Sequence, residues 1–224
     1  MTLVIGHRGA MGSCPENTLA CFERAAALGA DWVELDVRQS RDGALVVVHD
    51  ETLDRTTSTS GRVADYDAAE LRRLDVPTLD EVLDWARERQ IGVDIELKKA
   101  PPPQVVDAVR RAAMADRVLI SGFDHPLVRQ VKSLDPRLTI GLLYAHRAID
   151  AVRLAREADA EWLLPHWSYV VADDVQAAHA AGLRVGTWAT SEPAVLRSLI
   201  AAGVDAICTD HPDILRRVLD GGID

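Results

Sequence analysis

The sequence predicts an α/β fold, a single (β/α)8 TIM barrel formed by residues 1–224 as one domain. Short apolar, β-branched runs alternate with amphipathic segments rich in Ala, Leu and Arg over most of the chain, which indicates parallel β/α units. One further run forms an antiparallel hairpin, and setting it aside leaves eight parallel strands, the number that closes a barrel. An open doubly wound sheet is the alternative, although no predicted strand is followed by a Gly-x-Gly-x-x-Gly turn.

The N-terminal part contains a hairpin and an insertion. We expect strands over residues 3–6, 32–38 and 44–49, and a helix over 18–28 that ends at Gly29. Only residues 39–43 separate the second and third strands, too few for a parallel crossover, whereas Asp42-Gly43 is a strong hairpin signal. The third strand should therefore return antiparallel. Residues 50–77 then form a small polar insertion with a short helix at 67–74, typical of a lid or binding loop.

From residue 78 onward, helices and strands alternate regularly. Prolines near the helix starts and glycines after two helix ends support the boundaries. The predicted helices cover residues 78–89, 102–114, 126–134, 148–158, 172–181, 192–202 and 212–219, and the strands 91–97, 117–121, 138–143, 161–164, 183–188 and 205–209.

Composition and charge exclude several classes of function. The net charge of -10 argues against nucleic acid partners, which require a basic face, and against stable membrane association. No apolar run approaches the ~20 residues that span a bilayer, and the start of the chain lacks the features of a signal peptide. Three cysteines (Cys14, Cys21, Cys208) without metal-binding or redox spacing predict no disulfide framework, so we expect a cytoplasmic protein in which Cys14 is an incidental thiol. The oligomeric state is not indicated.

Two carboxylates lie two residues apart on an otherwise apolar strand. Side chains alternate along a strand, so Glu34 and Asp36 point to the same side. Two buried like charges require a positive partner, which is either an arginine or, as we favour, a metal ion. Glu96 has the equivalent position at the end of the next parallel strand and is the expected third ligand. Oxygen donors alone favour Mg²⁺ or Ca²⁺ over zinc.

Two histidines are the candidate acid and base. In a (β/α)8 barrel the active site lies at the carboxyl ends of the strands, and His7 follows the first strand. His49 ends the return strand, where antiparallel pairing places it roughly opposite Glu34. Because histidine titrates near neutral pH, both are suited to proton transfer, and which one is the acid stays open.

Three further side chains at strand ends suggest the substrate. Arg8 and Lys98, with a bound cation, would neutralise the oxygens of a phosphate group. Trp188, after the seventh parallel strand, would form a wall for an apolar part of the substrate. Charge neutralisation together with an acid and a base is what hydrolysis of a phosphodiester needs.

In combination, seven motifs resemble the glycerophosphodiester phosphodiesterase family and span nearly the whole chain in the family's order. They are His7-Arg8-Gly9, Pro15-Glu16-Asn17-Thr18, Glu34-Leu35-Asp36-Val37, His49-Asp50, Pro77-Thr78-Leu79-Asp80-Glu81-Val82-Leu83, Glu96-Leu97-Lys98 and Thr209-Asp210-His211-Pro212.

The resemblance implies a metal-dependent hydrolase acting on a small-molecule glycerophosphodiester. Glycerol 3-phosphate and an alcohol would be the products, with the glycerol hydroxyl attacking first to give a cyclic phosphate. Residues 50–77 would cap the glycerol side. The implied site has a divalent cation on Glu34, Asp36 and Glu96, His7 and His49 as acid and base, and substrate contacts from Arg8, Glu16, Asn17, Lys98 and Trp188.

One motif departs from the family pattern. The family has Trp-Thr-x-Asn where this chain has Trp188-Ala189-Thr190-Ser191, which affects substrate preference rather than catalysis. The alternatives are a lysophospholipase D-type phosphodiesterase on the same fold, a barrel isomerase with a carboxylate-bound metal, and a non-enzymatic ligand-binding barrel. The preferred alcohol is not indicated.

Overall fold

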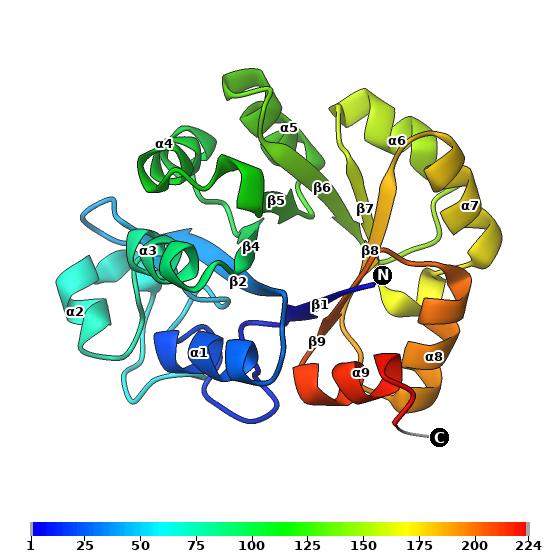
Figure 1. Ribbon diagram of the computed structural model, residues 1–224. Helices are drawn as coiled ribbons and strands as arrows, with labels where there is room; N and C mark the ends of the chain where they lie inside the picture. Colours follow the sequence, from blue (N-terminus) through cyan, green and yellow to red (C-terminus); the bar gives the residue numbers. More distant parts are fainter. Residues whose placement is uncertain (1, 223–224) are drawn as a thin grey trace.

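The computed structural model describes residues 2–222, and within this range eight parallel strands close into a barrel (Figure 1). Strand β1 pairs with both β2 and β9, so the ring has no open edge. The predicted (β/α)8 barrel is confirmed, and the open doubly wound sheet is excluded. The parallel strands are β1 (Leu3–Gly6), β2 (Trp32–Gln39), β4 (Gly92–Leu97), β5 (Val118–Gly122), β6 (Thr139–Tyr144), β7 (Trp162–Pro165), β8 (Arg184–Thr187) and β9 (Ala206–Thr209).

Eight helices surround these strands in the described range (Figure 1). Proline occupies the first turn of α4, α5, α8 and α9, where its missing N–H is not needed. None of the described helices is long and apolar enough to cross a membrane. The surrounding helices are α1 (Leu19–Ala27), α3 (Leu79–Arg89), α4 (Pro102–Ala112), α5 (His125–Leu134), α6 (Ala151–Ala158), α7 (Ala172–Ala180), α8 (Pro193–Ala202) and α9 (Pro212–Leu219).

The return strand β3 (Leu45–Val47) is antiparallel to β2, as predicted from the Asp-Gly turn. The strand is shorter than expected. Its last residue pair with β2 is Val37–Val47, and one more backbone hydrogen bond follows, from Val48 N to Asp36 O (2.9 Å). The ladder ends before His49, which lies in a bend after Val48, so no strand pairing tests the expected position of His49 roughly opposite Glu34.

The insertion after β3 has its own small core. A 3₁₀ helix, η1 (Val63–Asp65), and the helix α2 (Ala68–Arg72) pack around a cluster that includes Leu53, Val63 and Leu71. Helix α2 begins with a capping box between Asp67 and Glu70. In Figure 1, α2 lies beside α3, outside the ring of barrel helices. The predicted interruption and its short helix are confirmed.

The interior of the barrel is apolar at one end and polar at the other. Ile5, Leu119, Leu164 and Cys208 belong to one interior cluster. Because strand side chains alternate, the next inward positions toward the carboxyl ends are two residues later, and there the chain has His7, Ser121, His166 and Asp210. The polar rim thus follows directly from the alternation.

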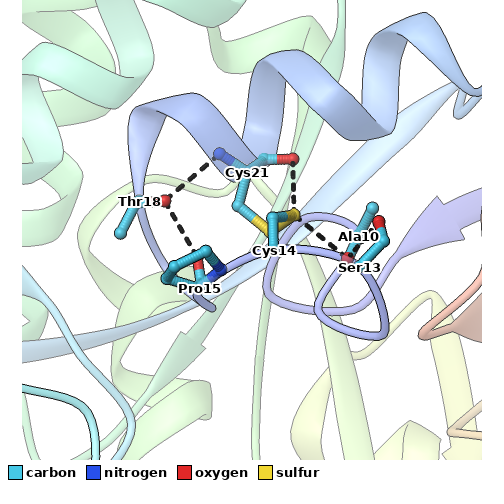
Figure 2. Close-up of a disulfide and its surroundings, with 6 residues drawn as sticks. All are labelled: Ala10, Ser13, Cys14, Pro15, Thr18 and Cys21. Atoms are coloured by element: carbon cyan, nitrogen blue, oxygen red, sulfur yellow. Dashed lines mark hydrogen bonds between the residues drawn. A yellow bond between two sulfur atoms is a disulfide. The ribbon is translucent and has the colours of Figure 1, made fainter.

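The expectation about cysteines is wrong. Cys14 and Cys21 form a disulfide, with Cα atoms 5.4 Å apart, between the β1–α1 loop and the first turn of α1 (Figure 2). Cys208 is a buried free thiol. The inference of a reducing compartment from unpaired cysteines therefore loses its basis.

Asp31 should be a key residue for barrel closure, because it links β1, the start of β2 and α9. Its carboxylate accepts hydrogen bonds from Val4 N (2.8 Å) and Arg216 Nη2 (2.5 Å). Asp31→Ala should lower the free energy of unfolding by ~1.5–3 kcal/mol, the range for hydrogen bonds to charged groups. Urea unfolding with an unchanged m-value would measure this.

The matched control is Asp213→Ala, which removes an ion pair with Arg217 along the surface of α9. Such exposed pairs contribute less than ~1 kcal/mol. Equal losses in the two variants would contradict the role of Asp31 in closing the barrel.

Candidate active site

A cavity of about 330 Å³ opens at the carboxyl ends of the strands. Every parallel strand or the segment directly after it contributes to its wall. A larger cavity of about 650 Å³ lies between α1 and the insertion, and it contains none of the predicted catalytic or metal-binding residues. The smaller cavity is lined by Ile5, His7, Arg8, Glu34, His49, Asp94, Glu96, Lys98, Ser121, Phe123, Leu143, Leu164, His166, Gly186, Thr187, Trp188, Ala189, Cys208 and Asp210.

The three predicted metal-binding carboxylates lie together at the edge of this cavity. Glu34 and Asp36 share one face of β2, and the register of β2 with β4 places Asp36 beside Glu96. All three side chains are buried, and each offers an oxygen within 4.8 Å of the others. The strand alternation that predicted the cluster also produces it.

Positive side chains contact this cluster, but in the part of the chain that the structure describes they leave one of its buried oxygens without a hydrogen bond. Arg8 Nε lies 3.3 Å from Asp36 Oδ2, and Lys98 Nζ lies 2.5 Å from Glu96 Oε1 and 3.4 Å from Asp36 Oδ1. Within the described residues, the buried Asp36 Oδ1 accepts no hydrogen bond. Both alternatives for the carboxylate pair, a basic side chain and a cation, thus have support in the geometry.

The electrostatics also fit a divalent cation. Burial raises the pKa of Glu34 well above its ordinary value, and repulsion from Asp36 and Glu96 adds to this. Burial and Asp36 likewise raise the pKa of Glu96. Carboxylate oxygens are the donors that Mg²⁺ and Ca²⁺ prefer, so these three residues could hold such an ion.

Glu16 and Asn17 lie behind the site. Asn17 Nδ2 donates to Asp36 Oδ2 (2.9 Å), and Arg8 Nη1 donates to Glu16 Oε1 (2.8 Å). Burial would raise the pKa of Glu16, but hydrogen bonds from Arg55 and Arg8 lower it to about 2. Neither residue lines the 330 Å³ cavity, so the structure gives both an orienting position, and their contact with substrate stays a prediction.

Each predicted catalytic histidine is held by a carboxylate. His7 Nδ1 lies 2.7 Å from Asp210 Oδ1, and His49 Nδ1 lies 2.6 Å from Asp50 Oδ1. A carboxylate on Nδ1 fixes the ring orientation and leaves Nε2 to exchange a proton with a ligand. Burial lowers the pKa of His49, helped by the positive charges of Arg8 and Lys98, although Asp36 and Asp50 oppose this.

Asp94 is a buried acid that sequence reasoning missed. It lies on β4 two residues before Glu96, and Ser121 Oγ donates a hydrogen bond to its Oδ1 (2.7 Å). Burial raises its pKa to about 7. The signal was present, because Asp94 and Glu96 repeat the alternation of Glu34 and Asp36.

An aromatic wall forms the other side of the cavity. The Trp188 ring meets Phe123 edge-to-face at 5.2 Å and His166 at 4.9 Å between centroids, and its Nε1 donates to Leu164 O (2.9 Å). Phe123 is 47% exposed, so its ring is free to contact a ligand. In the loop that departs from the family pattern, a hydrogen bond joins Ser191 Oγ to Thr209 Oγ1. Phe123 and His166 thus add two rings to the wall that was predicted from Trp188 alone.

Comparisons with known proteins agree with this geometry. Residues 7–214 match the family model described as the glycerophosphoryl diester phosphodiesterase family. The chain is 36% identical over 240 residues to a glycerophosphodiester phosphodiesterase of Caldanaerobacter subterraneus subsp. tengcongensis, with 99% of each chain covered. It is 32% identical over 235 residues to another from Bacillus altitudinis, with 95% of this chain and 96% of the relative covered.

Two solved structures extend the similarity to the fold. A glycerophosphodiester phosphodiesterase from Agrobacterium tumefaciens superposes with a TM-score of 0.85 at 32% identity, covering 96% of this chain and 99% of the other. A phosphodiesterase from Oleispira antarctica, in complex with the product sn-glycerol-3-phosphate, gives 0.88 at 27% identity, covering 98% and 97%.

A divalent cation should stabilise the fold through the carboxylate cluster. A ligand that binds only the native state adds ~2.7 kcal/mol at a concentration of 100 Kd. Glu34→Gln removes one negatively charged ligand of the cation and also lowers the repulsion among the carboxylates when no cation is bound. Most of the stabilisation by the cation should therefore be lost. Urea unfolding in chelator and in excess Mg²⁺ or Ca²⁺ measures the difference.

Glu51→Gln is the control, because its side chain is 64% exposed and lies outside the cluster. It should keep the full stabilisation by cation. A wild-type protein that gains no stability from either ion, or a Glu34→Gln variant that gains as much as wild type, would contradict the proposed ligand set.

Proposed function

The chain belongs to the glycerophosphoryl diester phosphodiesterase family and is a phosphoric diester hydrolase; on that premise we propose how its site acts. The substrate is a glycerophosphodiester, cleaved to glycerol 3-phosphate and an alcohol with Mg²⁺ or Ca²⁺ on Glu34, Asp36 and Glu96. One observation supports this most directly: two carboxylate-held histidines and a buried carboxylate cluster meet at one rim of the barrel.

Local positive charge must attract the anionic substrate, because the chain as a whole has a charge of -10. Arg8 and Lys98 line the cavity and contact the carboxylate cluster. Burial would lower the pKa of Arg8, but Asp36, Glu34 and Glu16 raise it, so it stays charged. A bound divalent cation would add charge neutralisation at the phosphate oxygens.

We assign the base to His49. Its lowered pKa keeps the imidazole neutral near pH 7, so Nε2 accepts the proton of the attacking glycerol hydroxyl. The new P–O bond closes a cyclic phosphate. It forms as the bond to the alcohol breaks, and His7, supported by Asp210, protonates the departing oxygen. Water then opens the ring with the two histidines in exchanged roles.

The aromatic wall favours one alternative substrate class. Phe123 is half exposed beside Trp188 at the cavity mouth, where it could contact an apolar leaving group. A lysophospholipid, cleaved in a lysophospholipase D-type reaction, presents such a group. The two substrate classes share the phosphate site and differ in what contacts the wall.

The proposed function predicts the reaction itself. With Mg²⁺ or Ca²⁺, the protein should release glycerol 3-phosphate from glycerophosphocholine or a related diester, and EDTA should stop the release. A panel of glycerophosphodiesters and lysophospholipids, assayed for the alcohol and for glycerol 3-phosphate, tests this. Activity that survives chelation rules out the metal, and turnover of lysophospholipids alone favours the alternative.

The assignment of the base predicts the acid limb of the pH profile of kcat/KM. A base acts when deprotonated, so kcat/KM should fall as the pH drops through the pKa of His49, and the midpoint should lie below 6.5. Asp50→Asn removes a carboxylate that raises this pKa, so the limb should move to lower pH. His49→Ala should lower kcat by ~10²–10⁴.

Asp54→Asn serves as the control, because Asp54 lies in the same insertion and its carboxylate accepts from Gly61 N rather than from His49. Its acid limb should match that of wild type. A limb midpoint above pH 6.5, or one that Asp50→Asn leaves in place, would remove His49 as the base.

A further inference from the structure

The loop between β1 and α1 is tied to its own helix by the Cys14–Cys21 disulfide (Figure 2). Cys21 lies in the first turn of α1 and is fully buried, whereas Cys14 lies in the loop and is half-buried. The bond closes a short segment with a sequence separation of seven. Glu16 and Asn17 lie inside this segment.

Both enclosed residues hold groups of the active site. Asn17 Nδ2 donates to Asp36 Oδ2 (2.9 Å), and Asp36 N donates back to Asn17 Oδ1 (3.4 Å). Glu16 Oε1 accepts from Arg8 Nη1 (2.8 Å). The cation-binding carboxylate and the phosphate-binding arginine are therefore oriented by the segment that the disulfide closes.

The backbone of this loop needs an external constraint. Arg8 and Asn17 have φ angles of 49° and 57°, in the left-handed region that costs free energy for residues other than glycine. Asn17 N donates to Arg8 O (2.9 Å), so the two strained residues support each other. The loop has further backbone hydrogen bonds, such as the one from Ser13 N to Ala10 O (2.8 Å), and the disulfide adds a covalent constraint to them.

Packing couples the disulfide to the rest of the loop. A Cβ on Gly9 would lie 2.8 Å from the carbonyl of Cys21, so the residue next to Arg8 rests directly on the disulfide-bonded turn. Thr18 caps this turn by accepting from Cys21 N (3.2 Å) and donates to Pro15 O (2.8 Å) (Figure 2). Movement of Cys14 away from Cys21 would thus be transmitted to both Glu16 and Arg8.

We propose that Cys14 and Cys21 are positioning residues, whose disulfide holds Asn17 on Asp36 and Glu16 on Arg8 and so sets the affinity of the site for its cation. The inference rests on the proposed function of this cluster. It makes the enzyme responsive to dithiol reductants. A dithiol gives two electrons and two protons to the S–S bond, yields two thiols and is itself oxidised to a disulfide.

The expected effect is large at the site and small in the fold. Loss of a residue that orients a metal ligand typically costs 10–100-fold in metal affinity or activity. The barrel strands and most of the helices lie outside the residues that the disulfide closes, so the far-UV circular dichroism spectrum should be unchanged. The proposal therefore predicts loss of affinity without loss of the folded state.

The first experiment establishes the bond in the full chain. Iodoacetamide applied to the denatured protein should label one cysteine, Cys208, before reduction and three after it, as read by mass spectrometry. Three labels before reduction would overturn the proposal.

The second experiment measures the affinity for Ca²⁺ by calorimetry. Oxidised wild type should bind with 10–100-fold higher affinity than wild type reduced with dithiothreitol, and reoxidation should restore it. Cys14→Ser should match the reduced protein and no longer respond to dithiothreitol. Ser13→Ala, a neighbouring exposed loop change, should stay within twofold of oxidised wild type. Equal affinity in oxidised and reduced wild type would overturn the proposal, independently of whether Cys14→Ser folds.

A third variant tests the route through Asn17. Because the disulfide acts on Asp36 through this amide, Asn17→Ala should bind Ca²⁺ weakly and show little further loss on reduction, a non-additive result. Full additivity would contradict a positioning role.

If oxidised wild type binds Ca²⁺ and cleaves diesters but its affinity for Ca²⁺ does not change on reduction, only this inference fails. If it does neither, the proposed function itself fails.

Discussion

Repulsion among three buried carboxylates is the constraint on which the rest of the site depends. Glu34, Asp36 and Glu96 lie with oxygens within 4.8 Å of one another, and burial in an apolar barrel makes their negative charges costly. Arg8 and Lys98 offset part of this cost, yet Asp36 Oδ1 still lacks a hydrogen-bond donor among the described residues. The protein therefore keeps an unbalanced negative cluster beside two positive groups, an arrangement suited to a cation and a phosphate.

The barrel supplies what such a cluster requires. Parallel register places Asp36 beside Glu96. The neighbouring strand β1 ends at Gly6, so His7 and Arg8 follow at the same rim. The antiparallel return of β3 brings His49 from outside the parallel set. Around this core, Glu16, Asn17 and their disulfide-closed loop fix the orientation of the charged groups. Rigid strands thus determine where the chemistry lies, and the β1–α1 loop determines how well it is oriented.

Much of the site could be predicted because its geometry is local. A period of two residues along β2 and β4 was enough to place the three carboxylates together. Asp42-Gly43 was enough to predict the hairpin, but not where its ladder ends, because β3 stops at Val47 and leaves His49 beyond the pairing. The disulfide was missed because it depends on how the loop folds back on α1, which the spacing of Cys14 and Cys21 does not reveal. Phe123 was missed for a similar reason, since its contact with Trp188 joins distant strands.

The most direct test of the account is crystallographic. Crystals soaked with Mn²⁺ and sn-glycerol 3-phosphate and measured at the manganese edge would locate the cation by its anomalous signal. The account predicts one strong peak among the carboxylates of Glu34, Asp36 and Glu96, with the phosphate group in contact with Arg8 and Lys98. A peak elsewhere with none among these carboxylates, or a phosphate bound away from both basic side chains, would contradict it.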